Sequence, residues 1–330
     1  MLALRDFSEE DMNKIMNTTV AMLGAGGLGS PSLRLLTAIG FGRIKIVDRD
    51  IVELSNIQRQ TVFNTEDIGK PKAEAAAENL SLMNPEVHFD PICISIDNEN
   101  IVDLLKGVDV IVDGLDSFKA RRAVNKASLL LKIPYVFAGA VEYYANLTTF
   151  IPEKTGCLHC VMGDAEDNPE NTCAHVGVSP TVLSIAASVE INEAIKLALG
   201  REPDLANRLM TIDTSSLSFD FFDIGRATDC DVCSHPQIEP SQNRKELGVI
   251  QLCSRSYNVS PTKPLELDLD SLAKKLDSSY SVDRKTRFIV VRIDPEIRVT
   301  IMSAGNLIVK GVNSADAAAR LFHDLIENVN

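Results

Sequence analysis

The sequence lacks an excess of positive charge. Its 330 residues contain 33 Lys and Arg against 46 Asp and Glu, which gives a net charge of −13 at pH 7. Such a chain would repel a nucleic-acid backbone, because binding to phosphates requires gathered cations. We therefore expect no nucleic-acid partner and favour a basic or neutral protein partner.

The sequence also lacks a long apolar run. Its longest apolar stretches, at 108–112 and 129–133, fall far short of the roughly 20 residues that a membrane-spanning helix needs. The first ten residues have no apolar core of the kind found in a secretory signal. No internal repeat or low-complexity tract is evident. We expect a soluble, cytoplasmic protein that has no membrane partner.

Cysteine is scarce and arranged in a way that argues against a disulfide framework. The seven cysteines are an odd number, and four of them form two short pairs, Cys157 with Cys160 and Cys230 with Cys233. A four-thiolate set has no open coordination position, so it predicts a structural Zn²⁺ site. The alternative is four reduced cysteines in a core.

A glycine-rich turn is the first motif that the sequence does contain. An apolar strand at 18–23 leads into Gly24-Ala-Gly-Gly-Leu-Gly29, and a helix is expected from Pro31 to Ile39, with Ser30 as its N-cap and Gly40 as its end. Small residues let backbone N–H groups approach a phosphate at a helix N-terminus. The turn therefore predicts phosphate binding through Gly24, Gly26, Gly27 and Gly29, but it fits nicotinamide and flavin enzymes equally well.

Polar residues after the second strand, expected at 43–47, narrow the nucleotide class. Asp48 lies 24 residues after Gly24, near the spacing at which an acidic side chain meets a ribose hydroxyl. Arg59 and Lys72 could balance the charge of a triphosphate. The alternative for these two residues is that they are solvated surface charges. The other candidates in this stretch are Asp50, Ser55, Asn56 and Gln58.

Asp116 is the candidate magnesium ligand. It follows a strand expected at 108–112, and ligands of open α/β sheets collect at the carboxyl ends of strands. One or two carboxylates together with phosphates form the usual Mg²⁺ arrangement. The alternative for Asp116 is the N-cap of the helix expected at 117–131.

The alternation of strands and helices predicts an α/β fold with a doubly wound, mostly parallel sheet and right-handed crossovers. Strands at 135–140 and 147–150 suggest an antiparallel extension, residues 157–179 an irregular loop region, and residues 180–199 a long helix. We expect a main domain over 1–235, a linker over 236–248 and a small α+β module over 249–330. The elements expected in that module are helices 267–276 and 315–328 and strands 288–293, 298–302 and 307–310.

These motifs together resemble the ThiF/MoeB/HesA family, whose members activate ubiquitin-like and sulfur-carrier proteins. The resemblance covers roughly residues 8–235, and the tail from Val249 resembles an extension found on some prokaryotic adenylyltransferases of this family. The residues that carry it are the glycine turn, Asp48-Arg-Asp50, Leu54-Ser-Asn-Ile-Gln-Arg-Gln60, Lys70-Pro-Lys72, Gly114-Leu-Asp-Ser117, both cysteine pairs and Thr172-Cys-Ala-His-Val-Gly177.

The resemblance implies that ATP and Mg²⁺ adenylate the C-terminal glycine of a β-grasp modifier protein and release pyrophosphate. Asp48 would then take the ribose, Ser55 to Arg59 and Lys72 would face the phosphates, and Asp116 with Ser117 would lie at the metal and nucleotide. The four paired cysteines would bind structural zinc. A homodimer is implied, as is a downstream conjugating enzyme or sulfurtransferase.

Cys173 matches a reactive cysteine of several family members. A thiolate that attacks the acyl adenylate would give a thioester or lead on to a thiocarboxylate. His175 or a helix N-terminus could lower the pKa of this thiol. The chain departs from the family in two places: its first 18 residues offer only Arg5 for an arginine that reaches the partner subunit, and Ser117 replaces an asparagine.

Three alternative functions fit part of the sequence. An NAD-dependent oxidoreductase would explain the glycine turn and Asp48 but not the polar cluster from Ser55 to Lys72. An ATP-dependent dehydratase that acts on an RNA base is disfavoured by the charge and by both cysteine pairs. A non-enzymatic protein-binding adaptor would not need intact phosphate-facing residues.

Overall fold

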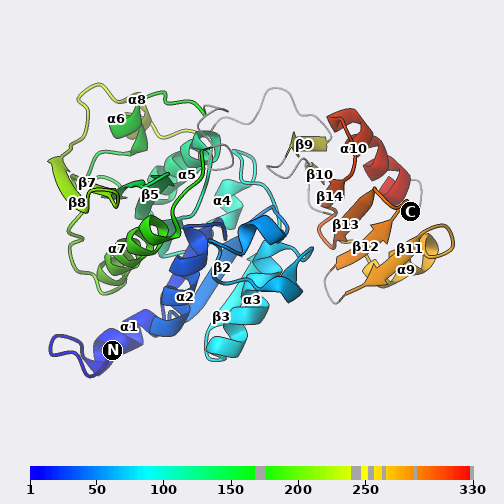
Figure 1. Cartoon of the computed structure of the whole chain (residues 1–330). Coiled ribbons are helices and arrows are strands. Elements are labelled where there is room, and N and C mark those ends of the chain that lie inside the picture. The colour runs from blue at the N-terminus through cyan, green and yellow to red at the C-terminus, as the bar shows by residue number, and fades with distance from the viewer. Residues whose placement is uncertain (168–175, 239–246, 252–255, 262–264, 286–287, 328–330) are drawn as a thin grey trace.

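The structure is a computed structural model, and it describes residues 1–167, 176–238, 247–251, 256–261, 265–285 and 288–327 (Figure 1). These residues form one sheet of eight strands and one of six, each with its own helices. Cys173, His175 and Cys253 lie outside the described residues.

The first sheet has the strand order β3-β2-β1-β4-β5-β6-β7-β8. The pairs among β1 to β5 are parallel, and the pairs from β5 to β8 are antiparallel. The predicted doubly wound sheet with an antiparallel extension is confirmed. Its strands are β1 (Thr19–Leu23), β2 (Arg43–Val47), β3 (His88–Ile92), β4 (Val110–Asp113), β5 (Tyr135–Val141), β6 (Tyr144–Phe150), β7 (Arg208–Asp213) and β8 (Ser218–Asp223).

Helices lie on both faces of this sheet. The helices α2, α3 and α7 contact one another on one face, and α4, α5 and α6 do so on the other. The helices are α1 (Glu9–Met16), α2 (Gly29–Ile39), α3 (Lys72–Met83), α4 (Ile101–Leu104), α5 (Phe118–Leu131), α6 (Leu158–Met162), α7 (Pro180–Ala198) and α8 (Asp231–Ser234), with 3₁₀ turns η1 (Leu54–Asn56) and η2 (Thr65–Asp67).

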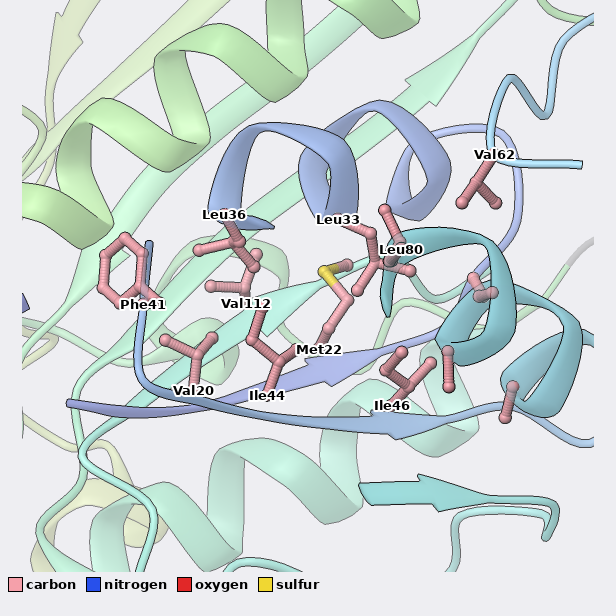
Figure 2. Packing of buried hydrophobic residues seen from close by; sticks show 14 of the residues in the cluster. Val20, Met22, Leu33, Leu36, Phe41, Ile44, Ile46, Val62, Leu80 and Val112 are labelled. Atoms are coloured by element: carbon pink, nitrogen blue, oxygen red, sulfur yellow. The ribbon is translucent and has the colours of Figure 1, made fainter. Parts of the chain in front are cut away.

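Branched and aromatic side chains from consecutive elements fill the core beneath α2 and α3. Figure 2 shows Val20 and Met22 of β1 and Ile44 of β2 facing Leu33 and Leu36 of α2. Strands buried on both faces read as apolar runs, which is why β1 and β4 are recognisable from sequence. Strand order reverses direction beside β1, so the carboxyl ends of β1 and β4 form the switch point at which ligands of such sheets bind.

The local predictions for α2 need correction. The helix begins at Gly29 and not at Pro31, its N-cap is Leu28, and no side chain caps it. Ser30 is therefore not the N-cap, and its hydroxyl donates to the carbonyl of Ala25 instead. Gly40 ends the helix in the left-handed region with φ 94°, as predicted.

The prediction of an irregular loop between Cys157 and Ser179 is wrong in part. The short helix α6 follows directly on Cys157, and its three buried or half-buried apolar residues pack onto the core beneath α5. Strands β7 and β8 were not predicted. In β8, three phenylalanines alternate irregularly with polar residues, and neither face of the strand is buried.

The second sheet is antiparallel, with the order β11-β12-β13-β14-β10-β9. The helices α9 (Leu269–Leu276) and α10 (Ala315–Phe322), followed by a π-helical turn (His323–Glu327), pack on one of its faces. Its strands are β9 (Leu247–Gln251), β10 (Tyr257–Pro261), β11 (Ser281–Arg284), β12 (Phe288–Arg292), β13 (Arg298–Met302) and β14 (Leu307–Lys310).

The sequence predicted β12 to β14 and both helices of this part, but not β9, β10 or β11. Strands β10 and β11 mix Ser, Asn, Pro or charged residues with a few apolar ones, and β9 is a short segment that contains a glycine, so none of the three shows clear apolar alternation. A search of the described helices for one long and apolar enough to span a membrane finds none.

Candidate nucleotide and zinc sites

The glycine turn connects β1 to α2 and packs tightly against the end of β4. A Cβ at Gly29 would lie 2.0 Å from the carbonyl oxygen of Gly24, and a Cβ at Gly114 would lie 2.5 Å from the same oxygen. Glycine is therefore required at both places. A Cβ at Gly26 would meet nothing closer than the side chain of Gln60, at 4.0 Å. The turn is thus open at Gly26, whereas a Cβ at Gly27 would lie 2.9 Å from Cδ1 of Leu183. The open position lies beside the uncapped, partly positive N-terminus of α2, which suits an anion.

Asp48, Asp50 and Lys72 form a charged cluster where β2 ends. The Asp48 carboxylate accepts from the backbone N–H of Ala25 at 2.7 Å and from that of Asp50 at 2.7 Å, which ties the glycine turn to this segment. Lys72 is 5% exposed and donates from Nζ to Asp50 Oδ2 at 3.1 Å. The interpretation of Lys72 as a solvated surface charge is therefore wrong.

Burial and neighbouring charges shift the pKa values of these three residues in opposite directions. Burial raises the pKa of Asp48, and neighbouring Lys72 only partly offsets it. Burial also acts to raise the pKa of Asp50, but Lys72 and Arg49 outweigh it and lower that pKa. Burial acts to lower the pKa of Lys72, whereas Asp50 and Asp48 raise it overall. Lys72 is thus a buried, charged ammonium that stays available to an anion.

The residues from Ser55 to Gln60 lie beside the open part of the turn. A Cβ at Gly27 would lie 3.7 Å from Cδ of Arg59, and the guanidinium of Arg59 donates to the carbonyl of Ser55 at 2.9 Å. The side-chain oxygen of Asn56 accepts from the N–H of Glu53 at 3.1 Å, so Asn56 also shapes the backbone of this segment. Ser55 and Gln58 are exposed.

Gln60, the last residue of the motif that begins at Leu54, is a further candidate site residue with no role predicted from the sequence. It is 3% exposed, and its Oε1 has no hydrogen-bond partner among the described residues. A buried amide oxygen without a partner is costly, so an unmet acceptor beside the glycine turn is consistent with a missing ligand. Its position directly after the arginine of the motif was the available signal.

Asp116 lies at the switch point with its side chain 64% exposed. The N-cap of α5 is Ser117, whose hydroxyl accepts from the N–H of Ala120, so the alternative of Asp116 as the N-cap is wrong. Asp167 accepts from the N–H groups of Phe118 and Lys119 as well. The carboxylate of Asp116 therefore does not cap α5. Its Oδ1 lies 4.0 Å from Nη2 of Arg49.

The residues present fit a nucleotide with its metal. Among the described residues, the four paired cysteines are the one group of three or more potential ligands close enough to share an ion. For Mg²⁺, one or two carboxylates such as that of Asp116 suffice where phosphate oxygens complete the coordination. Asp116 would hold the ion, the glycine turn with Arg59 and Lys72 would hold the phosphates, and Asp48 would hold the ribose.

A buried polar network supports the loop that carries Asp116. Arg121 donates from Nε to Asp113 at 3.0 Å and from Nη2 to the carbonyls of Leu115 and Ala138. Tyr135 donates its hydroxyl to Asp113. Glu190 of α7 accepts from the N–H of Asp113 at 3.1 Å. This network fixes the end of β4 and was not predicted, because Tyr135 and Glu190 reach Asp113 from 22 and 77 positions away in the sequence.

Glu190 is expected to be a neutral acid, so Glu190→Gln should preserve the fold. Burial raises its pKa well above the ordinary value, the hydroxyl of Ser32 lies 2.7 Å from Oε2, and that hydroxyl also donates to the carbonyl of Leu28. A protonated Oε2 that donates to Ser32 satisfies all three groups, and a glutamine amide can do the same.

A raised acid pKa makes the folded state less stable as pH rises from the unfolded value through the folded one. Urea unfolding should show Glu190→Gln equal to the parent within about 1 kcal/mol near pH 5 and relatively more stable at pH 8. Glu190→Ala, which leaves Ser32 and Asp113 without their partner, is the matched control and should be destabilised at every pH. A Gln variant as unstable as Ala would contradict the neutral assignment.

The four paired cysteines converge although about seventy residues separate the pairs. The Sγ atoms lie 3.9 Å apart for Cys157 and Cys160, 3.9 Å for Cys157 and Cys230, and 3.4 Å for Cys160 and Cys233. Tetrahedral Zn–S bonds of about 2.3 Å place sulfurs about 3.8 Å apart, so this set fits Zn²⁺. It ties α6 to α8 and leaves no open position for catalysis.

Comparison with known proteins shows which proteins this chain resembles. The model of the ThiF family matches residues 1–232. A SAMP-activating enzyme E1 of Haloferax volcanii is 30% identical over 78% of this chain and 94% of its own length. A sulfur carrier protein ThiS adenylyltransferase of Bacillus subtilis is 30% identical over 95% of this chain and 94% of its own length.

Among solved structures, E. coli MccB with ATP is similar at a TM-score of 0.61 and 27% identity, over 68% of this chain and 69% of that one. The architecture of the first sheet is therefore shared with a protein crystallised with ATP. The family model covers most of the chain, including the glycine turn, Asp116 and three of the four paired cysteines. The chain belongs to the ThiF family.

Proposed function

We propose that this enzyme uses ATP to adenylate the C-terminal glycine of a ubiquitin-like or sulfur-carrier protein and releases pyrophosphate. The observation that carries the proposal is the open, uncapped glycine turn flanked by Arg59 and Lys72, with the exposed carboxylate of Asp116 across the switch point. The named activities of the two curated relatives and the ATP-bound neighbour support it.

In the proposed reaction, the carboxylate of the modifier's terminal glycine attacks the α-phosphorus of ATP. The new acyl phosphate bond forms as the bond to pyrophosphate breaks. Arg59 and Lys72 would bind the phosphate oxygens and balance the negative charge that builds on the leaving group. Asp48 would orient the ribose. A magnesium ion, when bound, would neutralise phosphate charge, and Asp116 would hold it on the nucleotide.

ATP–pyrophosphate exchange tests this proposal directly. The purified chain should exchange labelled pyrophosphate into ATP only when a small β-grasp protein that ends in Gly-Gly is present. Removal of the terminal glycine should abolish exchange, because the attacking carboxylate moves. Absence of exchange with every candidate modifier, together with tight NAD binding, would instead favour the oxidoreductase alternative.

We further propose that Cys173 accepts the acyl group after adenylation. The resemblance of the surrounding residues to the family motif supports this step; the residue lies outside the described part of the chain. Cys173→Ala should leave pyrophosphate exchange within about twofold of the parent, because the adenylate forms first. It should also remove a thiol-sensitive adduct between chain and modifier on a non-reducing gel. Loss of exchange, or persistence of the adduct, would contradict this role.

Two finer points are also proposed. The resemblance to the family supports a homodimer, which light scattering would measure. The names of the curated relatives support either sulfur transfer or protein conjugation as the next step, since both begin from the same adenylate. A downstream sulfurtransferase or conjugating enzyme would take the activated modifier.

A further inference from the structure

The second sheet contacts the first part of the molecule through the face that its own helices leave uncovered. Along β12, Ile289 and Val291 pack with α9 and α10, whereas Phe288 joins the core formed by β1, β2 and α3. Met302 and Ile308 from the neighbouring strands belong to that same core. The C-terminal sheet is therefore packed on the nucleotide-binding part by a continuous apolar contact.

A chain of buried polar side chains sits within this contact. Asn258 of β10 is fully buried and donates from Nδ2 to the carbonyl oxygen of Arg49 at 2.9 Å. Its Oδ1 accepts from the hydroxyl of Ser260 at 2.6 Å. Asn306, which is 1% exposed, donates to the carbonyl of Cys93 at 2.7 Å. Because a buried amide that loses its partner is costly, these bonds fix where the sheet sits.

The bond to Arg49 falls inside the proposed nucleotide site. Arg49 stands between Asp48 and Asp50, and its guanidinium lies 3.8 Å from Oδ1 of Asp50 and 4.0 Å from Oδ1 of Asp116. Lys72 pairs with Oδ2 of Asp50 at 3.1 Å, whereas Oδ1 has no hydrogen-bond partner among the described residues and lies near the charge of Arg49. Asn258 thus binds the backbone carbonyl of Arg49, the residue whose guanidinium lies between Asp50 and Asp116.

The other end of the same segment is also contacted by the C-terminal part. Lys310 of β14 lies 4.0 Å from Oε1 of Glu53, directly before the turn η1. Glu53 in turn donates its N–H to Asn56. The C-terminal sheet therefore contacts both ends of the segment 49–53, which connects Asp48 to the turn that precedes Arg59.

We propose that the C-terminal module is part of the nucleotide site and that Asn258 is a positioning residue, which acts by fixing Arg49 and the carboxylates on either side of it. The inference rests on the proposed function for the identity of the nucleotide. It predicts that nucleotide affinity depends on a strand that begins more than twenty residues after the last zinc ligand.

The test compares two buried asparagines of one interface in the full chain. Asn258→Ala and Asn306→Ala each remove one bond to a backbone carbonyl of the first part. Asn306→Ala also removes a 3.3 Å bond to Oγ of Ser260, but only Asn258→Ala removes a bond to the segment that carries site residues. Asn258→Ala should raise the Kd for MgATP, measured by calorimetry, about tenfold, while Asn306→Ala should stay within about twofold at a similar loss of thermal stability.

A milder variant guards against failure to fold. Ser260→Ala removes the hydroxyl that orients Asn258 but leaves the bond to Arg49, so it should raise the Kd for MgATP about two- to threefold. Equal affinities for Asn258→Ala and Asn306→Ala, or unchanged affinity in Ser260→Ala when Asn258→Ala does not fold, would overturn the inference. Weakened binding in Asn258→Ala from a parent that binds ATP yet shows no pyrophosphate exchange would contradict the proposed function and still support the module's role.

Discussion

Replacing Asp116 with alanine is expected to abolish adenylation and leave the fold unchanged. Its carboxylate is the exposed acid at the switch point, its neighbour Ser117 already caps α5, and its closest cation is 4.0 Å away. Surface substitutions without a structural contact change stability by no more than about 0.5 kcal/mol. Loss of the group that holds the metal on the phosphates should lower the exchange rate at least about a hundredfold.

Two controls separate this role from a general effect of charge. Asp116→Asn keeps the shape and one oxygen but loses the charge, so it should retain little exchange and need more Mg²⁺. Asp103→Ala removes a comparably exposed aspartate, 72% exposed and paired with Lys106, and should exchange at the parental rate. Full exchange by Asp116→Ala at the parental magnesium concentration would refute the assignment.

The sequence predicted the parts of the site that follow directly on buried strands. The apolar runs of β1 and β4 and the alternating residues of β2 identify three parallel strands. Asp48 comes directly after β2, and Asp116 follows the end of β4 after Gly114 and Leu115. The carboxyl ends of neighbouring parallel strands meet at one edge, so order along the chain translates into proximity in space. The four cysteines were recognisable for a similar reason, since their spacing within each pair is set by local geometry.

The remaining features depend on contacts between distant segments. Glu190 meets Asp113 across 77 positions, and Asn258 meets Arg49 across 209. Neither pair has a local pattern, because each side chain pairs with a backbone group that only the finished fold places there. The N-cap assignment of Ser30 failed for a local reason, because Gly29 packs against Gly24 within the turn and the helix starts before the residue expected to cap it.

Replacing Cys230 with serine is expected to release one zinc ion per chain and to cost several kcal/mol of stability. Cys230 is 4% exposed, and its Sγ lies 3.9 Å from Sγ of Cys157. Its thiolate therefore joins the two cysteine pairs, and the four paired cysteines are together called the zinc clip. Structural zinc contributes on the order of 10 kcal/mol of apparent binding energy, and a serine hydroxyl replaces a thiolate poorly. Loss of one ligand should leave a three-thiolate site too weak to keep its metal during purification, so that a chelator has nothing left to remove.

Loss of the zinc ion is expected to destabilise α6 and α8 before the rest of the fold. The clip ties α8 to α6, and α6 packs on α5 through the N–H of Leu158, which donates to Asn125 at 2.9 Å. Hydrogen exchange should therefore quicken in α6 and α8 before the strands β1 to β4 respond. MgATP affinity should change less than in Asp116→Ala, because the glycine turn and Lys72 belong to elements that the clip does not contact.

Cys93→Ala is the matched control for this prediction, since Cys93 is also a buried cysteine but lies outside the clip. Its zinc content, measured by mass spectrometry after gel filtration, should equal that of the parent, and a chelator should lower the Tm of both alike. In Cys230→Ser the chelator should have no further effect on Tm. A Cys230→Ser chain that retains one tightly held zinc would show that Cys230 is not a required ligand. A parent that holds no zinc and whose Tm does not respond to the chelator would show that the four thiols are packing residues and not a metal site, so that apolar burial alone anchors α6.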